Sequence, residues 1–184
     1  MAIYFGGSRS LPSSPLLSQV VGSVLQSSQV VHVGCSTGAD QQVIECALRS
    51  SSFSQMRVFA AFEQSGIGSC VVSAVKVVQQ FAAAGGSVSW LAGGPLSVPL
   101  AARLILRSVA ALSGCSAAVF FQPGAGSLAV ASRAISAGVP VFAFSQSAPA
   151  TPAGCVGSWL PPSVSCGFWG WACWHWLPTQ APLF

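Results

Sequence analysis

The chain has 184 residues, of which 52% are hydrophobic and only 5% are charged. Ordinary soluble domains carry charge on about 25% of their residues, so this surface either depends on Ser, Gln and Thr or is covered by other copies, and we expect a homo-oligomer. The formal net charge of +4 arises without a block or stripe of Lys and Arg. It favours an anionic ligand but does not provide a strong nucleic-acid footprint.

The sequence contains no segment that predicts insertion into or passage across a membrane. No uninterrupted apolar stretch reaches the about 18 residues that a membrane-spanning helix needs. The first residues lack the basic region of a signal peptide and read directly as a strand. We therefore expect a cytoplasmic protein without a membrane partner.

Strand and helix patterns alternate along most of the chain. Short apolar segments predict strands at about 2–5, 29–33, 56–62, 87–91, 117–121 and 139–144. Helical patterns lie between them, near 14–27, 39–50, 69–84, 98–113 and 127–137. This alternation predicts an α/β fold: a Rossmann-like, doubly wound, mostly parallel sheet of about six strands with helices on both faces.

Local signals mark several helix ends. Pro15 and Pro99 suit a helix start, where the missing N–H costs nothing. Ser69 and Ser127 are predicted to cap helices by accepting a backbone N–H. His32 lies within an apolar strand and is interpreted as a core histidine.

The composition changes near residue 146, which divides a predicted domain at 1–146 from an extension at 147–184. The extension holds five of the six tryptophans, Trp159, Trp169, Trp171, Trp174 and Trp176. It could cover a sheet edge or helix layer, form a subunit interface, or stack bases of single-stranded nucleic acid. Packing on its own domain or at a subunit interface is favoured over base stacking, because no Lys or Arg follows Arg133. The metal-ligand types there, Cys155, Cys166, Cys173 and His175, lack the close pair of a zinc site, so no metal is expected.

Three glycine-rich turns each follow a predicted strand and precede a predicted helix. They are Gly6-Gly7-Ser8-Arg9, Gly34-Cys35-Ser36-Thr37-Gly38-Ala39-Asp40 and Pro123-Gly124-Ala125-Gly126-Ser127. Such turns present backbone N–H groups at a helix amino end, where phosphate is held favourably. We therefore predict a nucleotide or nucleotide-derived ligand, and no other cofactor, at the carboxyl edge of the sheet.

The candidate ligand-binding residues come mainly from these turns. Asp40 could stabilise its helix or bind a ribose hydroxyl. Glu63, after the third strand, could accept ribose or base N–H bonds or cap a turn. Arg103 and Arg107 share a helix face at i,i+4 and could clamp a diphosphate or DNA phosphates, or form a solvated stripe. The full set is Gly7, Ser8, Arg9, Gly34, Ser36, Thr37, Gly38, Asp40, Glu63, Arg103, Arg107, Gly124, Gly126 and Ser127.

Two common nucleotide-binding classes are excluded by their motifs. The sequence has no G-x-x-x-x-G-K-[ST] loop, and no G-x-G-x-x-G follows the first strand. A Walker ATPase and an ordinary NAD(H) dehydrogenase are therefore not expected.

Taken together, the three turns and Ala137-Gly138-Val139-Pro140-Val141 resemble the SLOG superfamily. That superfamily includes DNA-processing protein A and the lonely-guy, lysine-decarboxylase-like phosphoribohydrolases. The second turn is similar to its S-G-G-A-x-G-A-D motif and the third to its P-G-G-x-G-T motif. The resemblance spans residues 2–144 and implies nucleotide binding on a Rossmann-like fold.

The third turn departs from the enzymes of that superfamily. Their catalytic Glu follows the G-T pair, whereas this chain has Leu128-Ala129-Val130 there. Because acid–base catalysis needs a proton-transfer group within reach, we expect ligand binding without catalysis. The alternatives are a single-stranded DNA-binding recombination mediator like DNA-processing protein A and a nucleotide phosphoribohydrolase.

Overall fold

The computed structural model describes residues 1–27, 29–69, 71–161 and 171–179. Cys166 and Trp169, which the sequence analysis singled out, lie outside these ranges. Within the described ranges, no helix is both long enough and apolar enough to cross a bilayer.

The strands form a sheet in the order β4-β3-β2-β1-β5-β6-β8-β7. Six of them are parallel: β1 (Ala2–Gly7), β2 (Val30–Val33), β3 (Met56–Phe59), β4 (Ser87–Ser89), β5 (Cys115–Phe121) and β6 (Val141–Ser145). Two more, β7 (Gly157–Leu160) and β8 (Ala172–Pro178), pair in antiparallel fashion. The predicted α/β class with a mostly parallel sheet is confirmed.

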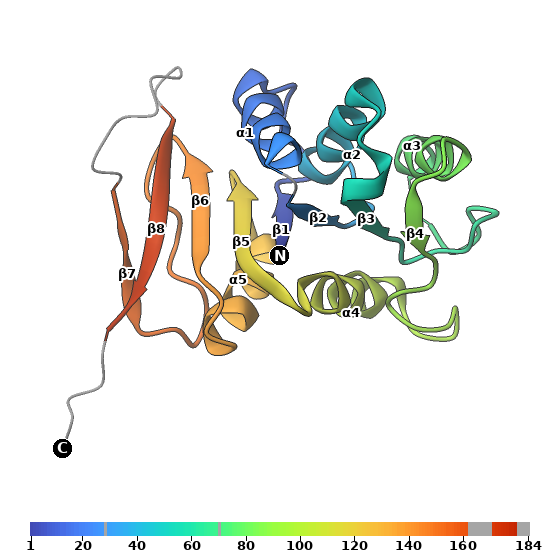
Figure 1. Ribbon diagram of the computed structural model, residues 1–184. Coiled ribbons are helices and arrows are strands. Elements are labelled where there is room, and N and C mark those ends of the chain that lie inside the picture. The colour runs from blue at the N-terminus through green and yellow to red at the C-terminus, as the bar shows by residue number, and fades with distance from the viewer. Residues whose placement is uncertain (28, 70, 162–170, 180–184) are drawn as a thin grey trace.

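Helices cover both faces of the parallel part of the sheet (Figure 1). One layer contains α1 (Pro15–Gln26), α2 (Ala39–Ser50) and α3 (Val72–Ala83), with a short 3₁₀ turn at Phe53–Gln55. The other contains α4 (Leu100–Leu112) and α5 (Ala125–Ser136). This two-layer cover explains why the inner strands β1, β2 and β5 are largely apolar and buried, since helices lie on both of their faces.

Several predicted boundaries need correction. The third strand ends at Phe59 rather than near residue 62. Helix α3 begins at Val72, so Ser69 does not cap it; the Ser69 hydroxyl accepts the Val71 N–H instead. Helix α5 begins at Ala125, which places Ser127 inside its first turn rather than at the cap. Pro15 does occupy the first turn of α1, as predicted.

The core lies in two clusters, one on each side of the sheet. Phe5, Phe121 and Phe144 stack in series across neighbouring strands on the side of α1–α3. On the other side, Phe120 packs with residues from α4 and α5. His32 is buried and its Nδ1 lies 2.8 Å from the Ala111 carbonyl oxygen, which confirms its interpretation as a core residue.

The extension contributes two strands that the sequence analysis did not predict. Strand β8 pairs with β6, placing Trp174 opposite Ala143, and β7 pairs with β8. Trp176 is buried against the α5 side of the sheet and meets Trp159 edge to face at 5.3 Å. The described part of the extension therefore continues the sheet instead of lying over it.

Candidate functional site

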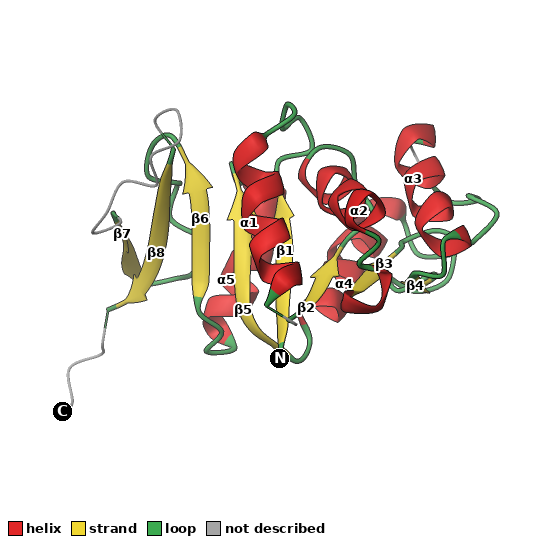
Figure 2. Ribbon diagram, turned by 45° about the horizontal axis from the view of Figure 1, so that its top comes forward, coloured by secondary structure: helices red, strands yellow, loops and turns green. Residues whose placement is uncertain are grey.

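The site lies where the strand order reverses. From β1 the chain proceeds outward to β2, β3 and β4, and then crosses back to β5 on the other side of β1. Figure 2 shows β1 and β5 side by side. In open α/β sheets this reversal opens a crevice beyond the carboxyl ends of the strands. All three glycine-rich turns follow those ends, so the fold brings them together as expected from the sequence.

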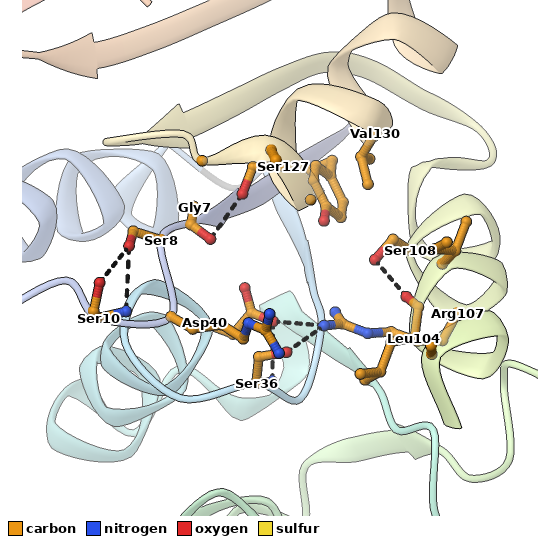
Figure 3. Close-up of a pocket in the computed structure, with 17 residues that line it drawn as sticks. Gly7, Ser8, Ser10, Ser36, Asp40, Leu104, Arg107, Ser108, Ser127 and Val130 are labelled. Atoms are coloured by element: carbon orange, nitrogen blue, oxygen red, sulfur yellow. Dashed lines mark hydrogen bonds and ion pairs between the residues drawn. The ribbon is translucent and has the colours of Figure 1, made fainter. Parts of the chain in front are cut away.

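A cavity of about 590 Å³ opens at this point (Figure 3). The turns after β1, β2 and β5 and helix α4 form most of its wall, which Tyr4 of β1 and Val130 of α5 complete. Nine of the residues expected from the sequence line it: Gly7, Ser8, Arg9, Ser36, Asp40, Arg107, Gly124, Gly126 and Ser127. Thr37 instead lines a small adjoining recess, together with Arg9, Ser36 and Cys35.

The third turn leaves the amino end of α5 open to the cavity. The first N–H groups of a helix have no partner within the helix. At Gly124 and Gly126 an added Cβ would meet nothing within 4 Å, and neither residue has a positive φ. Neither packing nor backbone conformation therefore requires glycine there. The hydroxyl of Ser127 donates to the Gly7 carbonyl oxygen at 2.8 Å and ties α5 to β1.

In the second turn, by contrast, close packing requires glycine. Gly38 has φ +72°, and a Cβ there would strike the backbone of Ser8 and Arg9. A Cβ on Gly34 would overlap the guanidinium of Arg107. Close packing therefore selects glycine at both positions, and neither lines the cavity.

The protein's own side chains occupy the inside of the second turn. The Asp40 carboxylate oxygen Oδ2 accepts the Ser36 N–H at 3.0 Å and lies 3.0 Å from Arg107 Nη2. Arg107 Nη2 also donates to the Ser36 hydroxyl at 2.7 Å. Both charged residues are buried. Asp40 therefore stabilises the turn and neutralises Arg107.

Arg107 is only partly satisfied by these contacts. Its Nε and Nη1 are buried without a hydrogen-bond partner among the described residues, although the side chain lines the cavity. Burial by itself lowers the pKa of the guanidinium, but the Asp40 carboxylate together with Cys35 and Tyr4 outweighs burial and holds the pKa above its ordinary value. Arg107 thus stays charged and retains two donors.

The first turn supplies the exposed cation of the site. Arg9 is exposed and forms no ion pair with the described residues, while its carbonyl accepts the Thr37 hydroxyl at 3.1 Å. The Ser8 and Ser10 hydroxyls lie 3.0 Å apart beside it. Of the three charged residues in the cavity wall, Asp40 and Arg107 cancel, so Arg9 provides the remaining charge.

Two candidate residues lie away from the cavity wall. Arg103 donates to the carbonyl oxygens of Ala61, Gly68 and Val98, which fastens the loop after β3 to α4. Glu63 accepts a bond from the Ser65 hydroxyl within that loop. The expected pair of free guanidiniums on α4 is therefore not formed. The alternative of a solvated stripe is also wrong, because Arg103 and Arg107 are both buried.

Eight residues that were not expected from the sequence complete the cavity wall. They are Tyr4, Ser10, Ala101, Leu104, Ile105, Ser108, Ala125 and Val130. Four of the eight belong to α4, which reaches the turns because the crossover from β4 to β5 spans the sheet. The strand order decides that placement, and no local motif encodes it.

Tyr4 was detectable only as an apolar strand residue; burial, followed by the Asp40 charge, raises its pKa to about 12.

The fold and the position of the cavity define a Rossmann-like α/β protein with a crevice at its switch point. No protein-family model matches the sequence, and neither does any curated protein. A solved structure of DNA processing protein A from Helicobacter pylori, described for its single-stranded DNA binding mode, matches with a TM-score of 0.60. The sequences are 15% identical, and the match covers 78% of this chain and 64% of the other. This chain thus has a fold like that of DNA processing protein A, and it spans less than two thirds of that chain.

Proposed function

We propose that the cavity binds a nucleotide or nucleotide-derived ligand, with a phosphate group at the amino end of α5, and that the protein acts without catalysis. The observation that carries the proposal is the amino end of α5, where two glycines leave no side chains over the first turn. Gly124 and Gly126 are required neither by packing nor by φ, and their lack of side chains leaves the helix N–H groups open to the cavity. A helix amino end attracts an anion through its free N–H groups and its dipole.

The cavity suits the size and the chemistry of such a ligand. Its volume of about 590 Å³ falls within the range of about 300–1,000 Å³ found for small-molecule sites. Leu104, Ile105 and Val130 form an apolar wall for a base or sugar. The hydroxyls of Ser8, Ser36 and Ser127, with Arg9, provide polar partners among the glycine-rich turns.

The resemblance of the three turns to the SLOG superfamily supports the same assignment. The third turn of this chain lacks the catalytic Glu of the superfamily's enzymes, which supports the absence of catalysis. Val130, at the end of the stretch that replaces their Glu, lines the cavity. Asp40 is the one carboxylate among the described lining residues, and it is paired with Arg107. We expect no free base to be released from nucleoside monophosphates; base release that is lost in Asp40→Ala would contradict this part of the proposal.

A ligand panel tests binding directly. Nucleoside monophosphates, ADP-ribose and inorganic phosphate are each added while thermal unfolding is followed. A ligand at about 100 times its Kd stabilises the protein by about 2.7 kcal/mol, which corresponds to a rise in Tm of about 5–10 °C for a domain of this size. No rise with any member would contradict the proposal.

A matched pair of variants locates the phosphate. Gly126→Asp places a carboxylate in the first turn of α5, where it favours the helix dipole but repels an anion. We expect it to fold normally and to lose at least about tenfold in affinity. Gly126→Ala, which adds a methyl group to open space, should bind within about threefold of the wild type. Equal binding by both variants would place the phosphate elsewhere.

The exposed cation is tested in the same way. Arg9→Ala removes the remaining positive charge of the cavity wall and should weaken binding of every phosphate-bearing ligand. Arg49→Ala removes an exposed arginine of α2, whose nearest carboxylate contact is 4.0 Å, and serves as the control. An unchanged affinity in Arg9→Ala would remove Arg9 from the site.

Binding of single-stranded DNA is the second candidate function, favoured by the fold shared with DNA processing protein A. Counterion release distinguishes it from the first. A strand that contacts several phosphates gives log K a slope against log salt of about −0.7 per phosphate, whereas a ligand held in the cavity uses Arg9 and one helix end. Anisotropy of a labelled oligonucleotide, titrated over a salt series, measures this slope. If the anisotropy of the oligonucleotide does not rise at low salt, DNA binding is excluded.

A further inference from the structure

Tyr4 carries a polar group into the apolar cluster on the α4 and α5 side of the sheet. It is 3% exposed, and its ring packs against Phe120 with 5.6 Å between the centroids. Residues two apart on a strand share a face, and a Cβ added to Gly6 would lie 2.9 Å from the Tyr4 hydroxyl oxygen. The phenol ring therefore extends along β1 toward its carboxyl end, where Tyr4 lines the cavity.

This ring also accounts for the first glycine of the first turn. Gly6 has no positive φ, so its backbone conformation does not call for glycine. An added Cβ would instead crowd the Tyr4 ring, whose nearest ring carbon would lie 3.0 Å away. Gly6 thus leaves the space in which the Tyr4 hydroxyl reaches the turn.

The Tyr4 hydroxyl is a neutral hydrogen-bonding group beside apolar side chains. Burial, followed by the Asp40 charge, raises its pKa to about 12, so it keeps its proton at neutral pH. Leu104, Ile105 and Val130 line the same cavity. Because an apolar surrounding strengthens the need for a hydrogen-bond partner, a ligand in contact with these side chains gains from a polar atom that meets the hydroxyl.

Arg107 supplies a second donor. Its Nη2 contacts Asp40 and Ser36, and its Nη1 lies over Gly34, where an added Cβ would overlap it. The buried Nε has no hydrogen-bond partner among the described residues. Asp40 already neutralises this guanidinium, so a phosphate buried against it would lack a counter-charge of its own, which is costly. A neutral acceptor satisfies Nε without that cost.

We propose that the nucleobase of the ligand lies between α4 and α5 and that the Tyr4 hydroxyl binds its edge, so that the ligand is a base-bearing nucleotide and not a sugar phosphate. This inference rests on the proposed function, in which the phosphate lies at the amino end of α5. A nucleobase has apolar faces and neutral acceptors on its edge. It therefore matches a wall that combines Leu104, Ile105 and Val130 with the donors of Tyr4 and Arg107.

A matched set of ligands tests the role of Tyr4. Calorimetry compares the monophosphates of adenosine, guanosine, cytidine and uridine with ribose 5-phosphate, which lacks the base. Tyr4→Phe removes the hydroxyl and keeps the ring, and thermal unfolding without ligand confirms that it is folded. We expect the tightest-binding nucleotide to lose about fivefold in affinity, as for one neutral hydrogen bond, and ribose 5-phosphate to bind as before. Equal losses for both ligands, or no loss for either, would overturn the contact with the base.

A spectroscopic measurement on the wild type does not depend on the variant. Tyr4 is the single tyrosine of the sequence, so ¹³C labelling of the tyrosine ring carbon that bears the hydroxyl gives one resonance. Saturation with the nucleotide should shift this resonance, whereas inorganic phosphate and ribose 5-phosphate should leave it in place. Thermal stabilisation by the nucleotide with an unmoved resonance would overturn this inference and leave the proposed function standing. No stabilisation by any phosphate-bearing ligand would overturn both.

Discussion

Asp40 of α2 and Arg107 of α4 form a buried ion pair, with 3.0 Å between Oδ2 and Nη2, that joins helices from opposite faces of the sheet. The guanidinium passes over Gly34 at the end of β2, where no side chain can be accommodated. One contact thus sets the shape of the second glycine-rich turn, fixes α4 beside the cavity and directs the polar side of α4 inward.

Removing one partner of this pair should be costly. Asp40→Ala leaves a buried guanidinium without its counter-charge, and we expect the free energy of unfolding to fall by about 3–5 kcal/mol. Urea unfolding measures the loss. Glu45→Ala, which removes a half-buried carboxylate 4.0 Å from the exposed Arg49, should cost less than about 1 kcal/mol. Similar losses in the two variants would show that the buried ion pair contributes no more to the free energy of unfolding than the Glu45–Arg49 pair does.

Two glycine-to-alanine changes should have opposite effects. In Gly34→Ala the new methyl group overlaps the Arg107 guanidinium, and we expect a loss of at least about 1–3 kcal/mol from overpacking. Gly126→Ala lies in a helix with open space around it, and should be neutral or stabilise by up to about 1 kcal/mol. Chemical unfolding of both variants makes the comparison, and a stable Gly34→Ala protein would contradict the described packing of Arg107.

Tyr4 should ionise well above the usual pH. It is the single tyrosine of the sequence, so phenolate absorbance reports it alone. Burial first, and then the Asp40 charge, raises its pKa from 10.0 to about 12 in the folded protein. The neutral form is therefore favoured on folding, and the stability it contributes is present below pH 10 and lost as the pH rises toward 12. A folded-state transition at the ordinary value, or an unchanged alkaline loss of stability in Tyr4→Phe, would contradict this expectation.

The loss of folding stability at acid pH should depend on protonation of His32. Burial, together with the Arg57 charge, lowers the pKa of its imidazole below 6.5 despite the bond to the Ala111 carbonyl. The unfolded chain then binds more protons than the folded protein between the lowered pKa and 6.5. Stability is full above that window and falls as the pH drops through it. Urea unfolding across this range should show the slope in the wild type, and a persistent slope in His32→Phe would assign it to another group.

The C-terminal strands should stabilise the domain. Trp176 is buried at 3% exposure, and Trp176→Ala should cost about 3–5 kcal/mol. The next residue, Leu177, is 41% exposed, and Leu177→Ala should stay within about 0.5 kcal/mol of the wild type. A thermal unfolding profile unchanged in Trp176→Ala would mean that β8 contributes little to the sheet.

The placement of β7 and β8 was beyond the sequence analysis because the extension shows no apolar–polar alternation of its own. Their tryptophans become strand residues only by pairing with the exposed edge of β6. The role of Arg103 was missed for a similar reason. Spacing placed Arg103 and Arg107 on one helix face correctly, but spacing does not say whether that face looks toward water or toward the core.

The alternation of strands and helices and the three glycine-rich turns at the strand ends could be predicted from the amino-acid sequence, because these depend on neighbours within a few residues along the chain. Three further features became visible only in the folded chain: which glycines leave open space, the neutralisation of Arg107 by Asp40, and the closing of the cavity by α4 with its apolar residues turned outward. Those outcomes depend on the order of strands in the sheet and on close contacts between residues more than sixty positions apart, which local propensity does not encode.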